Sequence, residues 1–357
     1  MRGNKGEWSE AYAWLKVLAD GKLVPGDEDL APLTGRDIAV LSVQREEEGE
    51  VTRYDIDTPE IEIQSSRFAV KRVPQFKVQS VCKAIYRSIL NTKEKTFEVP
   101  IASEFLESIG CRKLKASSNS KADFYAIIRD IETSETPRVG YSVKSQLGGA
   151  STLLNAGRTT NFIYKVKGDF SQNRLNQLNT MSGPGRLKRR IEQLYRDGAA
   201  LEFAEMENST FRRNLVYTDS LMPGIVAALL LEYYRGNGVN FPELVQSISV
   251  DDIQMHEEDL RGYLMRKTKQ LLSDIALGMV PSKPWNGSYK ATGAFAMVRE
   301  DGELVTYHLY NKDKFEAYLY RHTGLDTASM SRHGFGEFYF ENGEAFIKLN
   351  LQIRFRL

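Results

Sequence analysis

The sequence predicts an α/β protein with a mixed central sheet flanked by helices and a smaller β-rich part at the C-terminal end. Two segments, 122–131 and 138–146, alternate polar and apolar residues and are typical of strands joined by a polar connection. Three long segments with helical periodicity follow, at 185–206, 210–235 and 258–278. Chains that combine strands with helices in this way form α/β folds.

Helices are also expected on the N-terminal side of the two strands. Residues 7–19 repeat their apolar positions at helical spacing, as do 78–91 and 102–110. The charged stretch up to about residue 70 is expected to be variable, with Arg45 to Glu50 as a solvated turn.

Further strands are expected on the C-terminal side. Asn161 to Val166 has the β-branched and aromatic residues of a third strand. In the helical segment 210–235, Pro223-Gly224 should break or kink the helix. Alternating aromatic residues predict strands near 303–310, 336–341 and 345–355. The change of character near residue 280 suggests two parts, 1–280 and 281–357.

Composition limits the class of protein. The chain has 357 residues, 41% hydrophobic and 10% aromatic, which is enough for a real core in one large domain or two ordinary ones. The two cysteines form no CxxC motif, which excludes a disulfide framework or zinc ribbon and fits a reducing cytoplasm. The most apolar run, Ile225 to Leu231, is too short to span a bilayer. A cytoplasmic protein without a membrane partner is therefore expected.

Charge is unevenly distributed although the net charge is only +1. The segment from Arg112 to Lys167 contains ten Lys and Arg but only four Asp and Glu. A basic cluster follows, with Arg186, Lys188, Arg189 and Arg190. Such patches attract phosphate backbones. The alternative for each cluster is a solvated helix face.

The two central strands bring an acid and an amine together. Side chains alternate along a strand, so Ser142, Lys144 and Gln146 share one face. An antiparallel hairpin turning near Thr133-Ser134 would place Asp123 opposite Lys144, give or take a residue or two.

Phosphodiester hydrolysis needs such a pairing. A divalent cation bound by carboxylate and carbonyl oxygens stabilises charge on the phosphate and acidifies a bound water. Asp123 is the candidate ligand, with the Val143 carbonyl as a second, and the Lys144 ammonium could orient the water or neutralise developing charge. The alternative is an ordinary cross-strand ion pair.

Four segments carry a family resemblance. They are NKGEWSE (Asn4 to Glu10), SKADF (Ser120 to Phe124), SVKSQLGGASTLLNAGRTTNF (Ser142 to Phe162) and SRHGFGEFYFENGEAFIKLNLQIRF (Ser331 to Phe355). At these residues the chain resembles the PD-(D/E)xK nuclease superfamily, in a variant in which Ser142 replaces the usual acidic residue before the lysine. More narrowly, it resembles the HpaII family of Type II restriction endonucleases.

The resemblance implies a Mg²⁺-dependent endonuclease that cuts both strands of duplex DNA at a short palindrome, with CCGG as the suggested site. It implies a restriction-endonuclease-like core in 1–280 that includes helical DNA-binding elements. It also implies a companion methyltransferase that protects the same site. A homodimer is possible, but the sequence does not decide between monomer and dimer.

The chain departs from the family pattern at two positions. Ala122 replaces proline, which leaves the metal-binding carboxylate of the next residue unchanged. Ser142 cannot be an anionic ligand, so the second carboxylate must come from elsewhere. Similar nucleases carry a glutamate on the N-terminal helix, and of Glu7 and Glu10 the latter is favoured. The alternative is a solvated glutamate at a helix start. Gln146 could bind a water or ligand.

Small polar residues and arginines follow the lysine strand. These residue types suit phosphate oxygens and base edges, and guanine is usually read by arginine. The alternative is a polar turn that caps its own backbone. The candidate DNA contacts are Thr152, Asn155, Arg158, Thr159, Thr160, Asn161, Arg186, Lys188, Arg189, Arg190 and Arg332.

Two other functions remain open from the sequence. One is a repair endonuclease that uses the same site to nick a single strand. The other is a sequence-specific DNA-binding protein whose active site has decayed, because the second carboxylate is missing locally.

Overall fold

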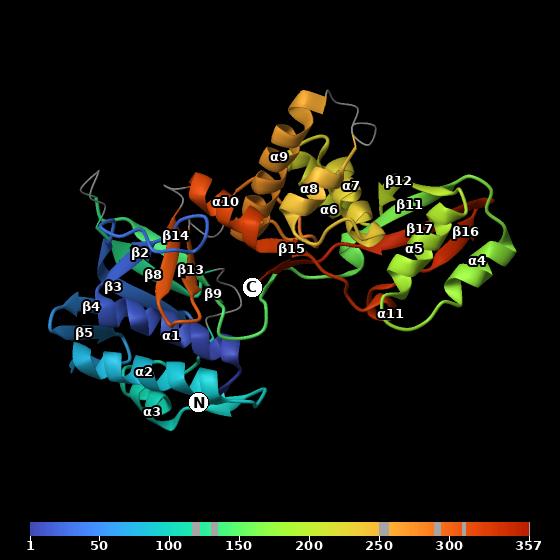
Figure 1. The fold of residues 1–357 in the computed structure, drawn as a ribbon. Coiled ribbons are helices and arrows are strands. Elements are labelled where there is room, and N and C mark those ends of the chain that lie inside the picture. Colours follow the sequence, from blue (N-terminus) through green and yellow to red (C-terminus); the bar gives the residue numbers. More distant parts are fainter. Residues whose placement is uncertain (116–121, 130–134, 250–256, 289–293, 309–311, 357) are drawn as a thin grey trace. The chain divides into compact units, whose positions relative to one another are not determined.

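The computed structural model describes residues 1–115, 122–129, 135–249, 257–288, 294–308 and 312–356. The chain folds into two compact units (Figure 1). Unit 1 comprises Met1–Ser151 and Tyr289–Tyr318, and unit 2 comprises Thr152–Ser288 and Leu319–Leu357. This division differs from the boundary expected near residue 280, because the C-terminal segment contributes strands to both units.

Unit 1 is built on a nine-stranded mixed sheet, which confirms the predicted fold class. Strands β9 and β13 pair in parallel, as do β2 and β14, and the other neighbours in the sheet are antiparallel. In spatial order the strands are β2 (Lys22–Pro25), β14 (Leu304–His308), β13 (Ala294–Val298), β9 (Arg138–Ser145), β8 (Phe124–Ile128), β3 (Ile38–Glu47), β4 (Glu50–Asp57), β5 (Glu60–Ser65) and β6 (Phe68–Pro74).

The helices of unit 1 are α1 (Lys5–Asp20), α2 (Gln75–Asn91) and α3 (Pro100–Ser108), which confirm the three N-terminal predictions. Helix α1 begins in a capping box, in which the side chains of Asn4 and Glu7 bond to each other's backbone N–H, and ends at Gly21 with φ 68°. The short strands β1 (Arg2–Gly3) and β7 (Phe97–Glu98) pair beside its start. Helix α10 (Lys312–His322) contributes to both units.

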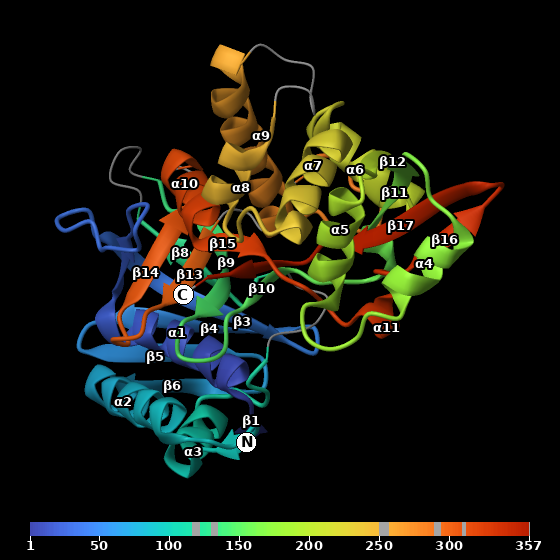
Figure 2. The same ribbon diagram turned by 45° about the vertical axis from the view of Figure 1, so that its right-hand side comes forward.

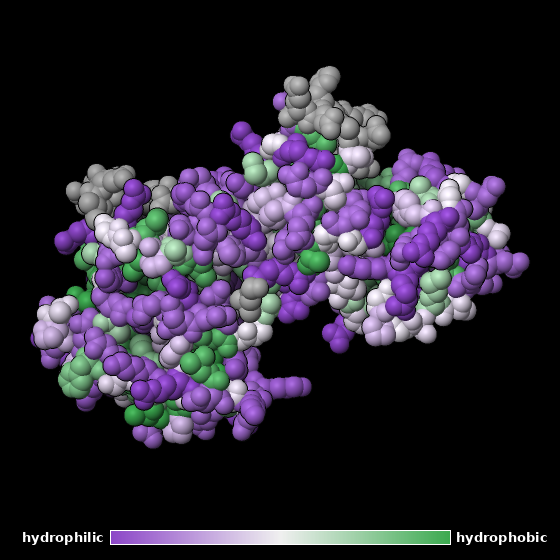
Figure 3. Space-filling view, in the orientation of Figure 1, coloured by the Kyte–Doolittle hydropathy of each residue, from purple (hydrophilic) through white to green (hydrophobic). Residues whose placement is uncertain are grey.

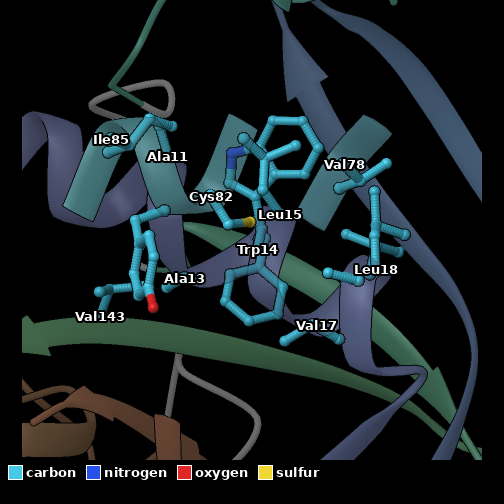
Figure 4. Packing of buried hydrophobic residues seen from close by; sticks show 14 of the residues in the cluster. Ala11, Ala13, Trp14, Leu15, Val17, Leu18, Val78, Cys82, Ile85 and Val143 are labelled. Atoms are coloured by element: carbon cyan, nitrogen blue, oxygen red, sulfur yellow. The ribbon is translucent and has the colours of Figure 1, made fainter. Parts of the chain in front are cut away.

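The core of unit 1 lies between the sheet and helices α1 and α2. In the close view, Trp14 and Leu15 of α1 lie beside Cys82 of α2, and Val143 of β9 lies near Ala13 (Figure 4). Trp14 and Leu15 are completely buried. Burying a side chain of this size stabilises the fold by roughly 1.5–3 kcal/mol, so α1 is fixed on the sheet by apolar contacts.

The charged stretch before residue 70 folds differently from the expectation. Strands β3 to β6 form an antiparallel meander there, and only Glu48-Gly49 turns the chain between β3 and β4. Arg45, expected in a solvated turn, is 3% exposed inside β3. The prediction was wrong because frequent acidic residues on the outer strands obscured the alternation of the inward-facing ones.

Unit 2 contains two antiparallel sheets covered by helices (Figure 2). The four-stranded sheet has the order β12 (Ala200–Met206), β11 (Asn161–Lys167), β17 (Glu344–Asn350) and β16 (Phe338–Glu341), and the three-stranded sheet has the order β10 (Thr152–Leu154), β18 (Ile353–Phe355) and β15 (Thr323–Leu325). Its helices are α4 (Gln172–Asn179), α5 (Arg186–Arg196), α6 (Ser209–Thr218), α7 (Met222–Arg235), α8 (Phe241–Ser247), α9 (Glu257–Leu277), α11 (Met330–His333) and the 3₁₀ turn η1 (Arg158–Thr160).

One helix prediction in this unit needs correction, and the predicted break of a second helix near Pro223 is confirmed. The segment 185–206 is helical only to Arg196, after which Gly198 adopts φ 81° and β12 begins. Glycine tolerates this left-handed conformation and ends the helix. The segment 210–235 breaks between α6 and α7, and Pro223 occupies the first turn of α7, where its missing N–H costs little. The predicted third strand and the C-terminal strands are confirmed.

Hydrophilic side chains cover most of the face seen in Figure 3, and the hydrophobic residues exposed on α2 and α3 include Phe76, Leu90 and Ile101. Among the described residues, no single helix has the length and apolar character needed to cross a membrane. Helices α6 and α7 meet those criteria only as a pair, with a bend of 106° between them.

Candidate active site

Asp123 lies where the ladder between β8 and β9 ends. The last paired residues are Phe124 and Tyr141. Beyond them the Asp123 backbone N–H donates to the Tyr141 carbonyl at 2.7 Å, and the Asp123 carboxylate accepts the Val143 N–H at 2.6 Å. The register therefore places Asp123 opposite Ser142, within the one or two residues expected around Lys144. The predicted turn near Thr133-Ser134, like residues 116–121, falls outside the described residues.

The two faces of β9 have different environments, as its alternation predicts. Tyr141 and Val143 point into the core under α1, whereas Ser142 and Lys144 are half-buried on the other face. The Lys144 ammonium lies 5.7 Å from the centre of the Phe295 ring. Its charge lowers the pKa of both Asp123 and Glu10, so the lysine is within electrostatic reach of both acids.

Glu10 is the second carboxylate at this place. Helix α1 is tied to the end of β9 by a hydrogen bond of 3.0 Å between the Ser9 and Ser145 hydroxyls. Burial, followed by the charge of Asp123, raises the pKa of Glu10 to about 7. Burial likewise raises the pKa of Asp123. Glu7, the competing candidate, is engaged in the capping box instead.

Two further cations near the acids had no signal in the sequence. Arg45 is buried, and its guanidinium donates to the carbonyls of Lys113 and Leu114 at 3.1 and 3.2 Å. It also lies 5.1 Å from the Trp14 ring centre. The charges of Arg45 and Lys115 both lower the pKa of Glu10 and of Asp123. Arg45 could have been found only by recognising β3 as a strand.

The oxygen atoms at this place fit a divalent cation. The Glu10 Oε2 atom is buried and receives no hydrogen bond from any described residue, as expected for an atom that has a cation as its partner. In a strand, the N–H and C=O of one residue point to the same edge, so the Val143 carbonyl faces the Asp123 side. Within the described part of the chain no three His, Cys, Asp or Glu side chains cluster. Two carboxylates with a carbonyl still suit Mg²⁺, which keeps several waters.

Gln146, which is expected to bind a water or ligand, makes two hydrogen bonds within unit 1. Its backbone N–H donates to the Val298 carbonyl at 2.9 Å, and its side-chain oxygen accepts the Glu300 N–H at 3.3 Å. The side chain thereby connects the end of β9 to the turn after β13.

Three of the expected DNA contacts are buried inside unit 2. Thr160 and Asn161 have no exposed surface, and Arg190 is 2% exposed. Thr160 and Asn161 bond to the Asn350 amide, and Arg190 donates to the Gly336 carbonyl at 2.6 Å. Their polarity suggested a DNA contact, but in the structure they hold the unit together.

The other candidate DNA contacts are at least partly exposed. Arg186 borders two adjacent hollows of about 520 and 380 Å³, which also share Met330 and Ser331. Lys188 lies 4.5 Å from the centre of the Tyr233 ring, and Arg189 donates to the Ser182 carbonyl at 2.6 Å. The remaining partly or fully exposed candidates are Thr152, Asn155, Arg158, Thr159 and Arg332.

Comparison with known proteins shows the family of the chain. The family model described as HpaII restriction endonuclease matches residues 4–355. The chain is 38% identical over 359 residues to the Type II restriction enzyme HpaII of Haemophilus parainfluenzae, covering 99% of this chain and 98% of the relative. No solved structure matches the chain significantly. The chain therefore belongs to the HpaII restriction endonuclease family, a family of site-specific deoxyribonucleases.

Proposed function

We propose that the protein is a Mg²⁺-dependent Type II restriction endonuclease that hydrolyses both strands of duplex DNA at a short palindrome, with CCGG as the site. Family membership supports site-specific DNA cleavage, and enzymes of this type generally use a divalent metal. The observation that carries the residue assignment is the pair of buried acids, Glu10 and Asp123, within electrostatic reach of Lys144.

In this proposal Asp123, Glu10 and the Val143 carbonyl hold the cation. When bound, the cation supplies charge stabilisation at the scissile phosphate and acidifies a water. The chain's own contribution is the placement of these groups. The bond from the Val143 N–H fixes the Asp123 carboxylate in one orientation. The Lys144 ammonium orients the attacking water or neutralises charge on the phosphate. Ser142 lies on the same face as Lys144 and adds no charge there.

The proposed partners are duplex DNA, a companion methyltransferase and a second copy of this chain. Duplex DNA contacts would come from the exposed donors of unit 2, above all Arg158, Arg186 and Arg332, because arginine binds phosphate and guanine in a bidentate manner. Thr152, Asn155, Thr159, Lys188 and Arg189 would add phosphate contacts. A companion methyltransferase would protect the same site. A homodimer would match the symmetry of a palindrome and supply one active site for each strand.

The test is digestion of a plasmid with Mg²⁺, followed by sequencing of the ends. We expect linear DNA with both strands cut at one short palindrome, and no cleavage with EDTA. Asp123→Ala serves as the inactive control. Accumulation of nicked circles without linear product would replace the proposal by a nicking endonuclease. Specific binding without cleavage under all metal conditions would indicate a protein with a decayed active site.

A further inference from the structure

A second carboxylate–lysine pair lies in unit 2, on a partly exposed face of the four-stranded sheet. Glu207 directly follows β12, and Lys348 lies in β17, on the far side of β11. The Lys348 ammonium reaches the Glu207 Oε1 atom at 2.8 Å. The two side chains are 26% and 32% exposed, so both keep a surface that another molecule can touch.

A buried amide network fixes the carboxylate of this pair. The Asn161 amide, which is completely buried, donates to the Glu207 Oε2 atom at 2.7 Å and to the His333 carbonyl at 3.0 Å. The buried Asn350 amide in turn donates to the Asn161 side-chain oxygen at 2.7 Å. Glu207 is therefore held through both oxygens. Burying polar groups is costly unless they are hydrogen-bonded. A surface ion pair stabilises a fold only slightly, so stability alone does not explain why buried amides hold this one.

The surroundings keep the pair charged. Burial would raise the pKa of Glu207, but hydrogen bonds from Lys348 and Asn161 and the charge of Arg158 outweigh it and hold the pKa below its ordinary value. The Lys348 ammonium also lies 5.9 Å from the centre of the Tyr339 ring. At neutral pH the pair therefore presents an anionic acceptor beside a cationic donor. The carboxylate has further lone pairs and the ammonium has further N–H groups for hydrogen bonds to another molecule.

Another cross-strand pair in the same sheet lacks these features. Lys165 of β11 bonds to Glu344 of β17, and their side chains are 31% and 50% exposed. The register places Lys165 on the same face as Lys348. Within the described residues, the buried asparagines bond to Glu207 and not to Glu344. Of these two pairs, the buried asparagines therefore fix the geometry of Glu207–Lys348.

In the major groove, a C·G base pair presents the cytosine amino donor beside the guanine O6 and N7 acceptors. We propose that the Glu207–Lys348 pair reads one C·G base pair of the recognition site: Glu207 accepts from the cytosine N4 amino group, and Lys348 donates to guanine. This inference rests on the proposed function, because it assumes specific binding of duplex DNA. A hollow of about 510 Å³ lies beside the pair, and Tyr339, Glu205 and Glu341 line it together with the two residues. Residues fixed before binding lose little entropy on contact with a base.

The experiment selects bound sequences from a random duplex library in Ca²⁺, which allows binding without cleavage. Wild type is compared with Glu207→Gln and Lys348→Met, and Lys165→Met is the matched control. We expect wild type to enrich a palindrome. Both variants should lose about ten- to a hundred-fold of the preference at one C·G pair per half-site, since a good base contact contributes roughly 1–3 kcal/mol. Lys165→Met should keep the wild-type preferences at every position.

The outcomes separate this inference from the proposed function. If both variants retain every base preference of wild type, or if wild type selects no sequence, the reading role is wrong. If binding behaves as expected but wild type cleaves no DNA with Mg²⁺, the proposed cleavage fails while the reading role stands. Thermal unfolding of each variant shows that it is folded. Glu207→Asp, which keeps the charge but shortens the side chain, provides a second variant should Glu207→Gln be unstable.

Discussion

The two units each contain a glutamate beside a lysine, but the pKa values of the two acids are shifted in opposite directions. In unit 1, burial and the neighbouring Asp123 raise the pKa of Glu10 to about 7, and its Oε2 atom has no described hydrogen-bond donor. In unit 2, Glu207 is bonded through both oxygens and its pKa is lowered. An acid that performs metal chemistry must keep oxygens free for the cation, whereas an acid that recognises a base gains from being fixed beforehand.

The largest effect should come from the acids and the lysine of unit 1. We expect Asp123→Asn and Lys144→Met each to lower the cleavage rate about 1000-fold or more, because each removes a group that acts on the phosphate or the cation. Specific binding in Ca²⁺ should be largely retained. Single-turnover cleavage and equilibrium binding measure the two separately. Cleavage at the wild-type rate by either variant would reject the assignment.

Breaking the buried asparagine network of unit 2 should lower stability. Asn350→Ala leaves the buried Asn161 side-chain oxygen without its amide donor, whereas the Gly157 carbonyl still accepts from the Thr160 N–H and hydroxyl. A buried group left without a partner costs about 1–3 kcal/mol, so the free energy of unfolding should fall by about 2 kcal/mol. Urea denaturation measures this, with the exposed Asn155→Ala as control. Equal free energies of unfolding for the two variants would show that the network does not stabilise the fold.

Replacing Glu10 of unit 1 should change the free energy of unfolding in the opposite direction and raise it. Without metal, the folded pKa of Glu10 is about 7, against an ordinary value of 4.5. A raised folded pKa stabilises the fold below pH 4.5, and this contribution is lost as the pH rises through 7. In EDTA at pH 8, Glu10→Gln should therefore be more stable than wild type by about 2 kcal/mol, with no difference at pH 4. Glu7→Gln preserves the capping box and should follow the wild-type pH profile.

The smallest effect concerns the cation. Mg²⁺ at a few times its dissociation constant should raise the free energy of unfolding of wild type by about 1 kcal/mol. The same addition should have no measurable effect on the double variant Glu10→Gln, Asp123→Asn. Thermal unfolding at pH 8 with and without Mg²⁺ gives both values. Equal stabilisation of both proteins would place the cation elsewhere.

Local patterns were sufficient to predict much of unit 1. The helical period of residues 7–19 and the alternation of 138–146 identified α1 and β9, and hence the meeting of Glu10, Asp123 and Lys144. The meander from β3 to β6 was missed because its exposed positions carry so many charges. Arg45 was missed with it.

Burial and long-range pairing were not predictable in the same way. Asn161 and Arg190 have the residue types of DNA contacts, but whether a polar side chain faces solvent depends on tertiary packing. Glu207 and Lys348 are 141 residues apart in sequence and meet only because β11 lies between their strands. No sequence period connects such positions.

The hydroxyl contact between Ser9 and Ser145 connects the helix and the strand one residue away from Glu10 and from Lys144. A shift of α1 by a single turn, about 5.4 Å, would break this contact and carry Glu10 away from Asp123. The alignment of the two acids therefore depends on the position of α1 on the sheet. Substitutions beneath α1, far from any phosphate, should silence the enzyme at temperatures where the protein is still fully folded.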